Sequence, residues 1–162
     1  MNKDIKLNIG GGKLKIDGFI NIDLCEDADL KHDLRKPLPF KDGEVKEIIA
    51  VHVIESFYKF QFLEIVKDWK RTLDGTMTIE FTDLDMTIDM YLNGRGIERM
   101  LGKWGLYGNQ DIPCDPIVYH HYVYTKDELE KILIDAGFTD IQFTKENIEH
   151  VVKRDWRVIC KS

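Results

Sequence analysis

The sequence predicts an α/β fold, a single domain over residues 1–162 in which helices flank a mostly parallel, twisted sheet. Three observations predict this fold. An apolar strand at residues 5–9 runs into a glycine turn, residues 45–81 give strand, helix and strand in succession, and residues 139–160 form a final pair of strands. The middle unit predicts a right-handed crossover within a parallel sheet, and the final pair predicts an antiparallel edge at the C-terminus. A length of 162 residues suits one domain with a sizeable core.

The first two predicted strands are separated by a glycine run and a short connector. Ile5–Ile9 is apolar at alternate positions, glycines occupy 10–12, and residues 19–24 form a second apolar strand. The connector KLKIDG is too short for a full helix, because each helical turn takes 3.6 residues. The polar, proline-containing stretch that follows also opposes a long helix, with a brief extended piece at 29–34.

The middle of the chain predicts the crossover unit. Residues 45–53 are rich in β-branched and apolar side chains, as expected of a buried strand. Residues 57–73 carry apolar side chains at helical spacing. Asp74-Gly75 then predicts a turn before a strand at 77–81.

The last third of the chain predicts an insertion and a capped helix. Residues 87–106 favour helix but contain four glycines, so we expect one or two short helices and then a loop over 107–123. We expect the whole segment 87–123 to form an insertion or lid over the site. Thr125, with a glutamate three residues later, predicts a capping box at the start of a helix over 126–136.

The composition is that of a globular protein with no general attraction to nucleic acid. Apolar residues make up 43% of the chain, and 23 Lys and Arg against 29 Asp and Glu give a net charge of -6. Cys25, Cys114 and Cys160 are odd in number and widely spaced, which favours reduced thiols over a disulfide framework or a zinc site. The sequence shows no apolar signal core and no membrane-length apolar run. We therefore expect a cytoplasmic protein without a membrane partner.

The glycine run and the acid that ends the second strand predict a nucleoside site. Glycine is needed where the backbone takes a positive φ or approaches a ligand closely. Ligands of open α/β sheets bind outside the carboxyl ends of the strands, where the glycine run lies. Asp23 reaches the same edge, and its carboxylate can accept hydrogen bonds from both hydroxyls of a ribose.

Several segments, in their order along the chain, resemble the motifs of the small class I S-adenosylmethionine-dependent methyltransferases. These segments are LNIGGG, INID, HDLRKPLPF, VHVIESF, RTLDGTMTIEFTD and YTKDELEKILIDAGF. The resemblance covers nearly the whole chain. It implies the Rossmann-like fold of that family, S-adenosyl-L-methionine as cofactor, and methyl transfer to a small molecule, sugar or glycan precursor. Residues 87–123, which resemble the family least, would then select the acceptor.

The resemblance also implies which residues bind the cofactor. The glycines would bring the backbone to its methionyl part, Asp23 would hold the ribose, and Asp33 and Leu34 would contact the adenine. His52 would lie under the sulfonium. The full set is Asn8, Gly10, Gly11, Gly12, Asp23, Leu24, Asp33, Leu34 and His52.

An oxygen acceptor would also require a general base within hydrogen-bond reach. We assign His52, Asp83 and His121 as catalytic candidates, with Glu55 and His120 as further possible bases. Adjacent histidines on extended backbone point to opposite faces, so His120 and His121 together predict no metal site.

Three other functions stay open at this point. The first is a noncatalytic S-adenosylmethionine-binding or interaction module that retains the fold, which the reduced first helix favours. The second is a nicotinamide enzyme, but a GxGxxG pattern that starts at Gly10 has Lys15 in place of its last glycine. The short connector also supplies no helix N-terminus for a pyrophosphate. The third is methylation of nucleic acid or protein, and the acidic net charge disfavours nucleic acid.

Overall fold

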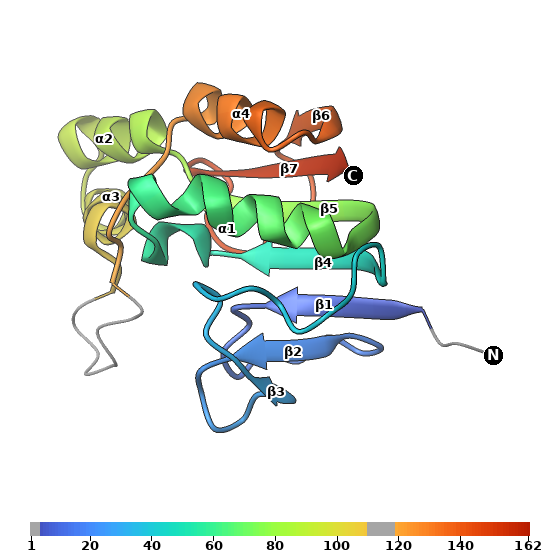
Figure 1. The fold of residues 1–162 in the computed structure, drawn as a ribbon. Coiled ribbons are helices and arrows are strands. Elements are labelled where there is room, and N and C mark those ends of the chain that lie inside the picture. The colour runs from blue at the N-terminus through green and yellow to red at the C-terminus, as the bar shows by residue number, and fades with distance from the viewer. Residues whose placement is uncertain (1–3, 110–118) are drawn as a thin grey trace.

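The computed structural model of the chain describes residues 4–109 and 119–162. These residues form a seven-stranded sheet with the strand order β3-β2-β1-β4-β5-β7-β6 (Figure 1). Strands β1 to β5 are parallel, and β7 is antiparallel to both of its neighbours, which confirms the predicted parallel sheet with an antiparallel edge. The strands are β1 Ile5–Ile9, β2 Ile20–Asp23, β3 Leu30–Lys31, β4 Val45–Val51, β5 Leu73–Thr82, β6 Thr139–Thr144 and β7 Asp155–Lys161.

The α-helices lie within a few residues of the predicted positions, and η1 is a further short helix that the sequence analysis did not predict. They are η1 Ile54–Ser56, a single 3-10 turn, and the α-helices α1 Lys59–Thr72, α2 Leu84–Asn93, α3 Ile97–Tyr107 and α4 Lys126–Asp135. The apolar stripe that predicts α1 is buried, including Phe62, Val66 and Trp69. The predicted capping box is confirmed at α4: the Thr125 hydroxyl accepts the N–H of Glu128, and the Glu128 carboxylate accepts the N–H of Thr125. No helix in the described ranges is long and apolar enough to cross a membrane.

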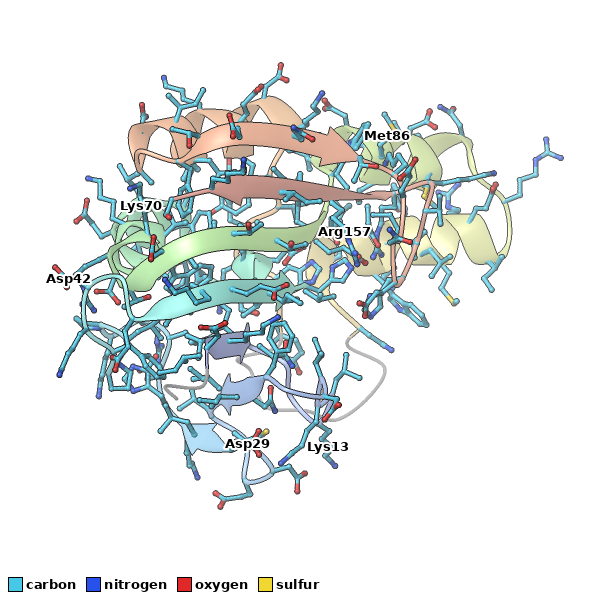
Figure 2. The ribbon with its side chains drawn as sticks, turned by 90° about the vertical axis from the view of Figure 1, so that its right-hand side faces the viewer. Lys13, Asp29, Asp42, Lys70, Met86 and Arg157 are labelled. Atoms are coloured by element: carbon cyan, nitrogen blue, oxygen red, sulfur yellow. The ribbon has the colours of Figure 1, made fainter. Side chains whose placement is uncertain are left out.

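Helices α1 and α4 lie together on one face of the sheet (Figure 1), and no helix within the described residues covers the opposite face (Figure 2). The cause is that residues 10–19, like the later links to β3 and β4, contain no helix, as the short connector predicts. Side chains on the uncovered face stay partly exposed, among them the neighbours Ile49, Thr78 and Ile159. Alternation between buried and partly exposed residues is typical of a sheet with one covered face.

The start of β5 differs from the sequence-based expectation. β5 begins at Leu73, where α1 ends, so the turn predicted at Asp74-Gly75 is wrong. Gly75 has a different reason to be glycine, because a Cβ there would lie 2.1 Å from the carbonyl oxygen of Lys46. The glycine therefore permits the close approach of β4 and β5.

Helices α2 and α3 pack against each other and confirm the expectation of short helices in this region. The chain breaks at Gly94 and Gly96, as predicted from the glycines. Gly102 and Gly105 do not break α3: a Cβ at Gly102 would lie 2.6 Å from the backbone nitrogen of Tyr91. These two glycines are therefore the contact surface between the helices.

One predicted segment is described only in part, and one predicted strand is shorter than expected. Within the predicted insertion or lid, residues 110–118, including Cys114, lie outside the described residues. The strand predicted from residue 151 begins only at Asp155. Before it, the N–H of Arg154 donates to the carbonyl oxygen of Val151 at 2.8 Å and closes a turn.

Candidate functional site

A cleft opens at the carboxyl ends of β1, β2 and β4, the edge toward which the arrows of these strands point in Figure 1. Ligands of open α/β sheets bind at this edge. Its lining residues are Gly10, Asp23, Leu24, His32, Asp33, Leu34, Arg35, His52, Val53, Ser56, Phe57 and His121. Every cofactor residue that the resemblance implies lies in this lining except Asn8, Gly11 and Gly12.

Gly10 lines the cleft with bare backbone. Its φ of +66° lies in the left-handed region, and a Cβ would lie 2.1 Å from Cγ2 of Val53. The N–H of Gly10 donates to the carbonyl oxygen of Ile22 at 2.8 Å, which fixes the turn against β2. The position therefore requires glycine both for its conformation and for its packing.

Asn8 lies beneath the glycine turn and outside the cleft. The Asn8 side chain is 2% exposed, and its Nδ2 donates to the Leu14 carbonyl oxygen at 2.8 Å and to Oδ1 of Asn21 at 3.1 Å. Nδ2 of Asn21 in turn donates to the Gly12 carbonyl oxygen at 2.8 Å. A Cβ at Gly11 would collide with both asparagine side chains. Asn8 and Gly11 therefore shape the turn.

Asp23 ties the end of β2 to the glycine turn. Its Oδ2 accepts the N–H of Gly12 at 2.9 Å, and its Oδ1 accepts the N–H of Cys25 at 2.9 Å. A carboxylate oxygen has two acceptor positions, so each oxygen of Asp23 retains one. The side chain lines the cleft and can still accept the two hydroxyls of a ribose.

Asp33 and Leu34 lie in the cleft wall after β3. Asp33 accepts a pair of hydrogen bonds from the Arg35 guanidinium at 2.8 and 2.9 Å, and this interaction holds the pKa of Asp33 below its ordinary value. The Leu34 side chain is buried and adds apolar surface beside the acid. The wall therefore combines an ionised acceptor with an apolar face.

Sequence reasoning missed five lining residues, which are His32, Arg35, Val53, Ser56 and Phe57. Each of them belongs to HDLRKPLPF or VHVIESF, two of the segments that carry the family resemblance. Their position inside these motifs was the available signal. Membership of a motif does not, however, distinguish a residue that lines the cleft from one that faces the core.

His52 borders the cleft but its ring is held among acids. Its φ is +49°, uncommon for a residue with a side chain. Nδ1 lies 3.4 Å from Oε1 of Glu55, and Nε2 lies 3.2 Å from Oδ2 of Asp155 and 3.6 Å from Oε1 of Glu80. Burial disfavours the charged ring, but the three carboxylates outweigh burial and raise the pKa of His52 to about 11. Because such a ring keeps its proton at neutral pH, the geometry argues against His52 as the general base.

Asp83 lies away from the cleft, at the start of α2. The side chain is 3% exposed, its Oδ1 accepts the N–H of Met86, and its Oδ2 accepts the N–H of Lys126. Asp83 therefore caps α2 and joins it to the first turn of α4. This placement does not bring it to the cleft as a catalytic residue.

His121 is the catalytic candidate that lies in the cleft wall with an exposed side chain. The ring centroid of His121 lies 4.5 Å from that of Tyr58. The backbone N–H of His121 donates to the Glu55 carbonyl oxygen at 2.7 Å. The neighbouring His120 turns elsewhere, with Nδ1 2.7 Å from the carbonyl oxygen of Gly105. The two histidines thus face different partners, as expected of adjacent residues.

No protein-family model matches the chain, and no curated protein matches its sequence. Solved structures do resemble it. An S-adenosylmethionine-dependent methyltransferase from Archaeoglobus fulgidus matches with a TM-score of 0.65 and 16% identity, over 99% of this chain and 87% of that one. A second such enzyme, from Methanosarcina mazei, matches with a TM-score of 0.65 and 17% identity, over 100% of this chain and 94% of that one.

A third similar structure comes from Thermotoga maritima and is described as an S-adenosylmethionine-dependent methyltransferase, possibly a histamine N-methyltransferase. It has a TM-score of 0.59 and 17% identity, over 99% of this chain and 83% of that one. Together with the strand order, these similarities show that the chain has the class I S-adenosylmethionine-dependent methyltransferase fold, as its motifs imply. Identities at this level establish the fold alone.

Proposed function

We propose that the chain is an S-adenosylmethionine-dependent methyltransferase that acts on a small molecule, sugar or glycan precursor. The observation that carries this proposal is the meeting of Gly10, Asp23 and Leu34 in one cleft of a methyltransferase fold. These residues come from three separate segments, and each has the chemistry that a different part of the cofactor requires.

The chemistry of the cleft lining suits this cofactor. Gly10 presents bare backbone to the cleft, and Asp23 retains acceptor positions for the ribose hydroxyls. Leu34 and Phe57 offer apolar surface to an adenine ring. S-adenosylmethionine has no phosphate, so the lack of a helix in residues 10–19, all of which are described, is no obstacle to its binding.

When bound, S-adenosylmethionine would supply a methyl group on a sulfonium; the lone pair of the acceptor would bond to the methyl carbon as the C–S bond breaks, and S-adenosylhomocysteine would leave. The chain must then orient the acceptor in line with that methyl group and exclude water. His121 is the group proposed to receive a proton from an oxygen acceptor, because it lines the cleft with an exposed side chain.

The surface beside the cleft supports a small, flat acceptor. Tyr58 is 48% exposed and Phe60 is 80% exposed, and their ring centroids lie 5.6 Å apart in a stacked arrangement. The ring of His121 continues this aromatic surface into the cleft. Exposed aromatic faces suit a sugar ring or a planar small molecule, whereas the net charge of -6 disfavours nucleic acid.

Calorimetric titration with S-adenosylmethionine and S-adenosylhomocysteine, with NAD as a control, tests the cofactor. We expect saturable binding of the first two ligands and none of NAD. Asp23→Ala is expected to weaken the binding of both by about 10–100-fold, the value of about one hydrogen bond to a charged group. Asp17→Ala, which removes an exposed acid outside the cleft lining, is the matched control and should bind normally. Equal affinity in the wild type and Asp23→Ala would contradict the placement of the ribose.

One observation favours a second function, a noncatalytic module that binds S-adenosylmethionine. Two of the three catalytic candidates are otherwise engaged: His52 by three carboxylates and Asp83 by two backbone N–H groups. Cofactor binding without turnover across a broad acceptor panel would support this module. Turnover that His121→Ala abolishes, with cofactor affinity unchanged, would support the enzyme instead.

A further inference from the structure

Two histidines and a glutamate converge at the carboxyl ends of β4 and β5. His52 follows β4, Glu80 lies near the end of β5, and His150 comes from the segment between β6 and β7. One nitrogen or oxygen of each lies within 4.8 Å of the corresponding atoms of the other two. Arg157, labelled in Figure 2, lies at the same corner of the uncovered face and donates to Glu80.

The spacing of these atoms suits a metal ion. Nε2 of His52 lies 3.6 Å from Oε1 of Glu80, and Nδ1 of His150 lies 3.5 Å from the same oxygen. These distances are longer than those of ordinary N–H···O hydrogen bonds. Ligands held about 2.0–2.2 Å from a tetrahedral zinc ion lie about 3.3–3.6 Å from one another, which matches both pairs.

Neighbouring groups hold two of these side chains in the orientation that a metal requires. Nδ1 of His52 lies 3.4 Å from the fully buried carboxylate of Glu55, so Nε2 points into the cluster. Nε2 is buried and makes no hydrogen bond of good geometry among the described residues, although Oδ2 of Asp155 lies 3.2 Å from it. Oε2 of Glu80 accepts from Arg157 at 3.1 Å, and Oε1, which also accepts the backbone N–H groups of Glu149 and His150, faces the two histidine rings. Metal-ligating histidines typically donate their other ring N–H to a carboxylate, and metal-ligating carboxylates typically accept a hydrogen bond from a neighbouring donor.

The charge around the cluster also calls for a cation. Metal ligands must be deprotonated, so a bound ion would take the place of the proton that His52 otherwise carries, and both histidines then count as neutral. Four carboxylates then face two guanidinium groups and the ammonium of Lys145, whose Nζ donates to the carbonyl oxygen of Asp155 at 2.7 Å, so one negative charge is left unmatched. The carboxylates are those of Glu55, Glu80, Glu149 and Asp155, and the guanidinium groups are those of Arg154 and Arg157.

We propose that Nε2 of His52, Nδ1 of His150 and Oε1 of Glu80 bind a divalent transition-metal ion of the zinc type. Imidazole and carboxylate donors favour such ions over magnesium and calcium, which prefer oxygen ligands. Three protein ligands leave a fourth position for water or for an acceptor group. The His150 side chain is 52% exposed and gives the ion a path from solvent. This pair of histidines differs from His120 and His121, whose adjacency predicts no site.

The test uses the full chain without a polyhistidine tag. Calorimetric titration with Zn²⁺ is expected to show one ion per chain, and Co²⁺ is expected to give the intense visible bands of a four- or five-coordinate site. His150→Ala should weaken binding by at least about 100-fold, and Glu55→Gln, which alters a supporting group, by about 10–100-fold. His121→Ala removes an exposed histidine outside the cluster and should bind both ions as the wild type does.

Each other outcome overturns the proposal. A folded wild-type chain that shows no saturable binding has no such site, and His150→Ala with wild-type affinity places the ion elsewhere. If His121→Ala and His150→Ala both weaken metal binding, exposed histidines bind the ions individually and no three-ligand site exists. Urea unfolding in the presence of a chelator establishes that each variant is folded. Titration of the same proteins with S-adenosylmethionine is a separate readout, so the metal site and the proposed function can fail independently.

Discussion

At the scale of single residues, Gly10 combines a left-handed backbone with a neighbour that occupies the Cβ position. Gly10→Ala is expected to lower the free energy of unfolding by about 2–4 kcal/mol, because it adds overlap with Val53 to the cost of a positive φ. Gly18 also has a positive φ, +80°, but a Cβ there would have no neighbour within 4 Å among the described residues. Gly18→Ala should therefore cost only about 1–2 kcal/mol. Urea denaturation measures both, and equal losses would contradict the overlap.

Cys160 should be unreactive in the native protein, unlike Cys25. Cys160 is 0% exposed, and burial raises the pKa of its thiol to about 12, so almost no thiolate forms at about pH 8. Cys25 is partly exposed, with Sγ 3.3 Å from the Gly12 carbonyl oxygen. In a Cys114→Ser background, a thiol reagent should label Cys25 in the native state and Cys160 only after urea is added. Peptide mass spectrometry identifies the labelled residue, and fast native labelling of Cys160 would contradict its burial in β7.

At the scale of elements, the contact between α2 and α3 reverses the usual effect of alanine in a helix. Replacing an interior helical glycine by alanine commonly stabilises a helix by about 1 kcal/mol. At Gly102, however, the new Cβ would lie 2.6 Å from the backbone nitrogen of Tyr91. Gly102→Ala should therefore destabilise the protein by about 1–3 kcal/mol, as overpacking does. Lys103→Ala, at an exposed neighbour in the same helix, should change stability by less than about 0.5 kcal/mol. Chemical denaturation of the two variants makes the comparison.

The capping box of α4 gives a second prediction for an element. Thr125→Ala removes the hydroxyl that accepts the N–H of Glu128 and should cost about 1 kcal/mol of unfolding free energy. Thr125→Ser keeps the hydroxyl and should recover most of that loss. The midpoint of urea unfolding measures both variants, and an equal loss in the two would show that the methyl group, not the cap, is responsible.

At the scale of the whole molecule, much of the sheet could be predicted because most strands carry their own pattern. Ile5–Ile9 and Thr139–Thr144 have the predicted bounds, since each apolar or alternating run ends at glycine or at polar residues. The prediction failed at Asp74-Gly75, where a dipeptide typical of turns lies inside β5. Pairing with the neighbouring strand decides such a position, and a local window does not contain that information.

Cleft residues that lie together in one sequence motif could be predicted. Contacts between residues that are far apart in the sequence could not. Asp33 and Leu34 are adjacent in the chain and line the cleft together, as the resemblance implies. The surroundings of His52 could not be predicted, because Glu80 and Asp155 lie far from it in sequence: Glu80 approaches when β4 and β5 pair, and Asp155 when β5 and β7 pair. Those contacts change its chemistry from a base to a charged ring.

The position of β7 has a consequence for how the protein is made. β7 inserts between β5 and β6, although both precede it in the chain. On the ribosome, β5 emerges with one edge paired to β4 and the other open, and β6 has no neighbour to join until residues 155–161 arrive. An open edge strand is a template for pairing with another chain. Nascent copies on the same messenger are therefore most exposed to each other in the interval before β7 pairs, and slow delivery of residues 155–161 would prolong that interval.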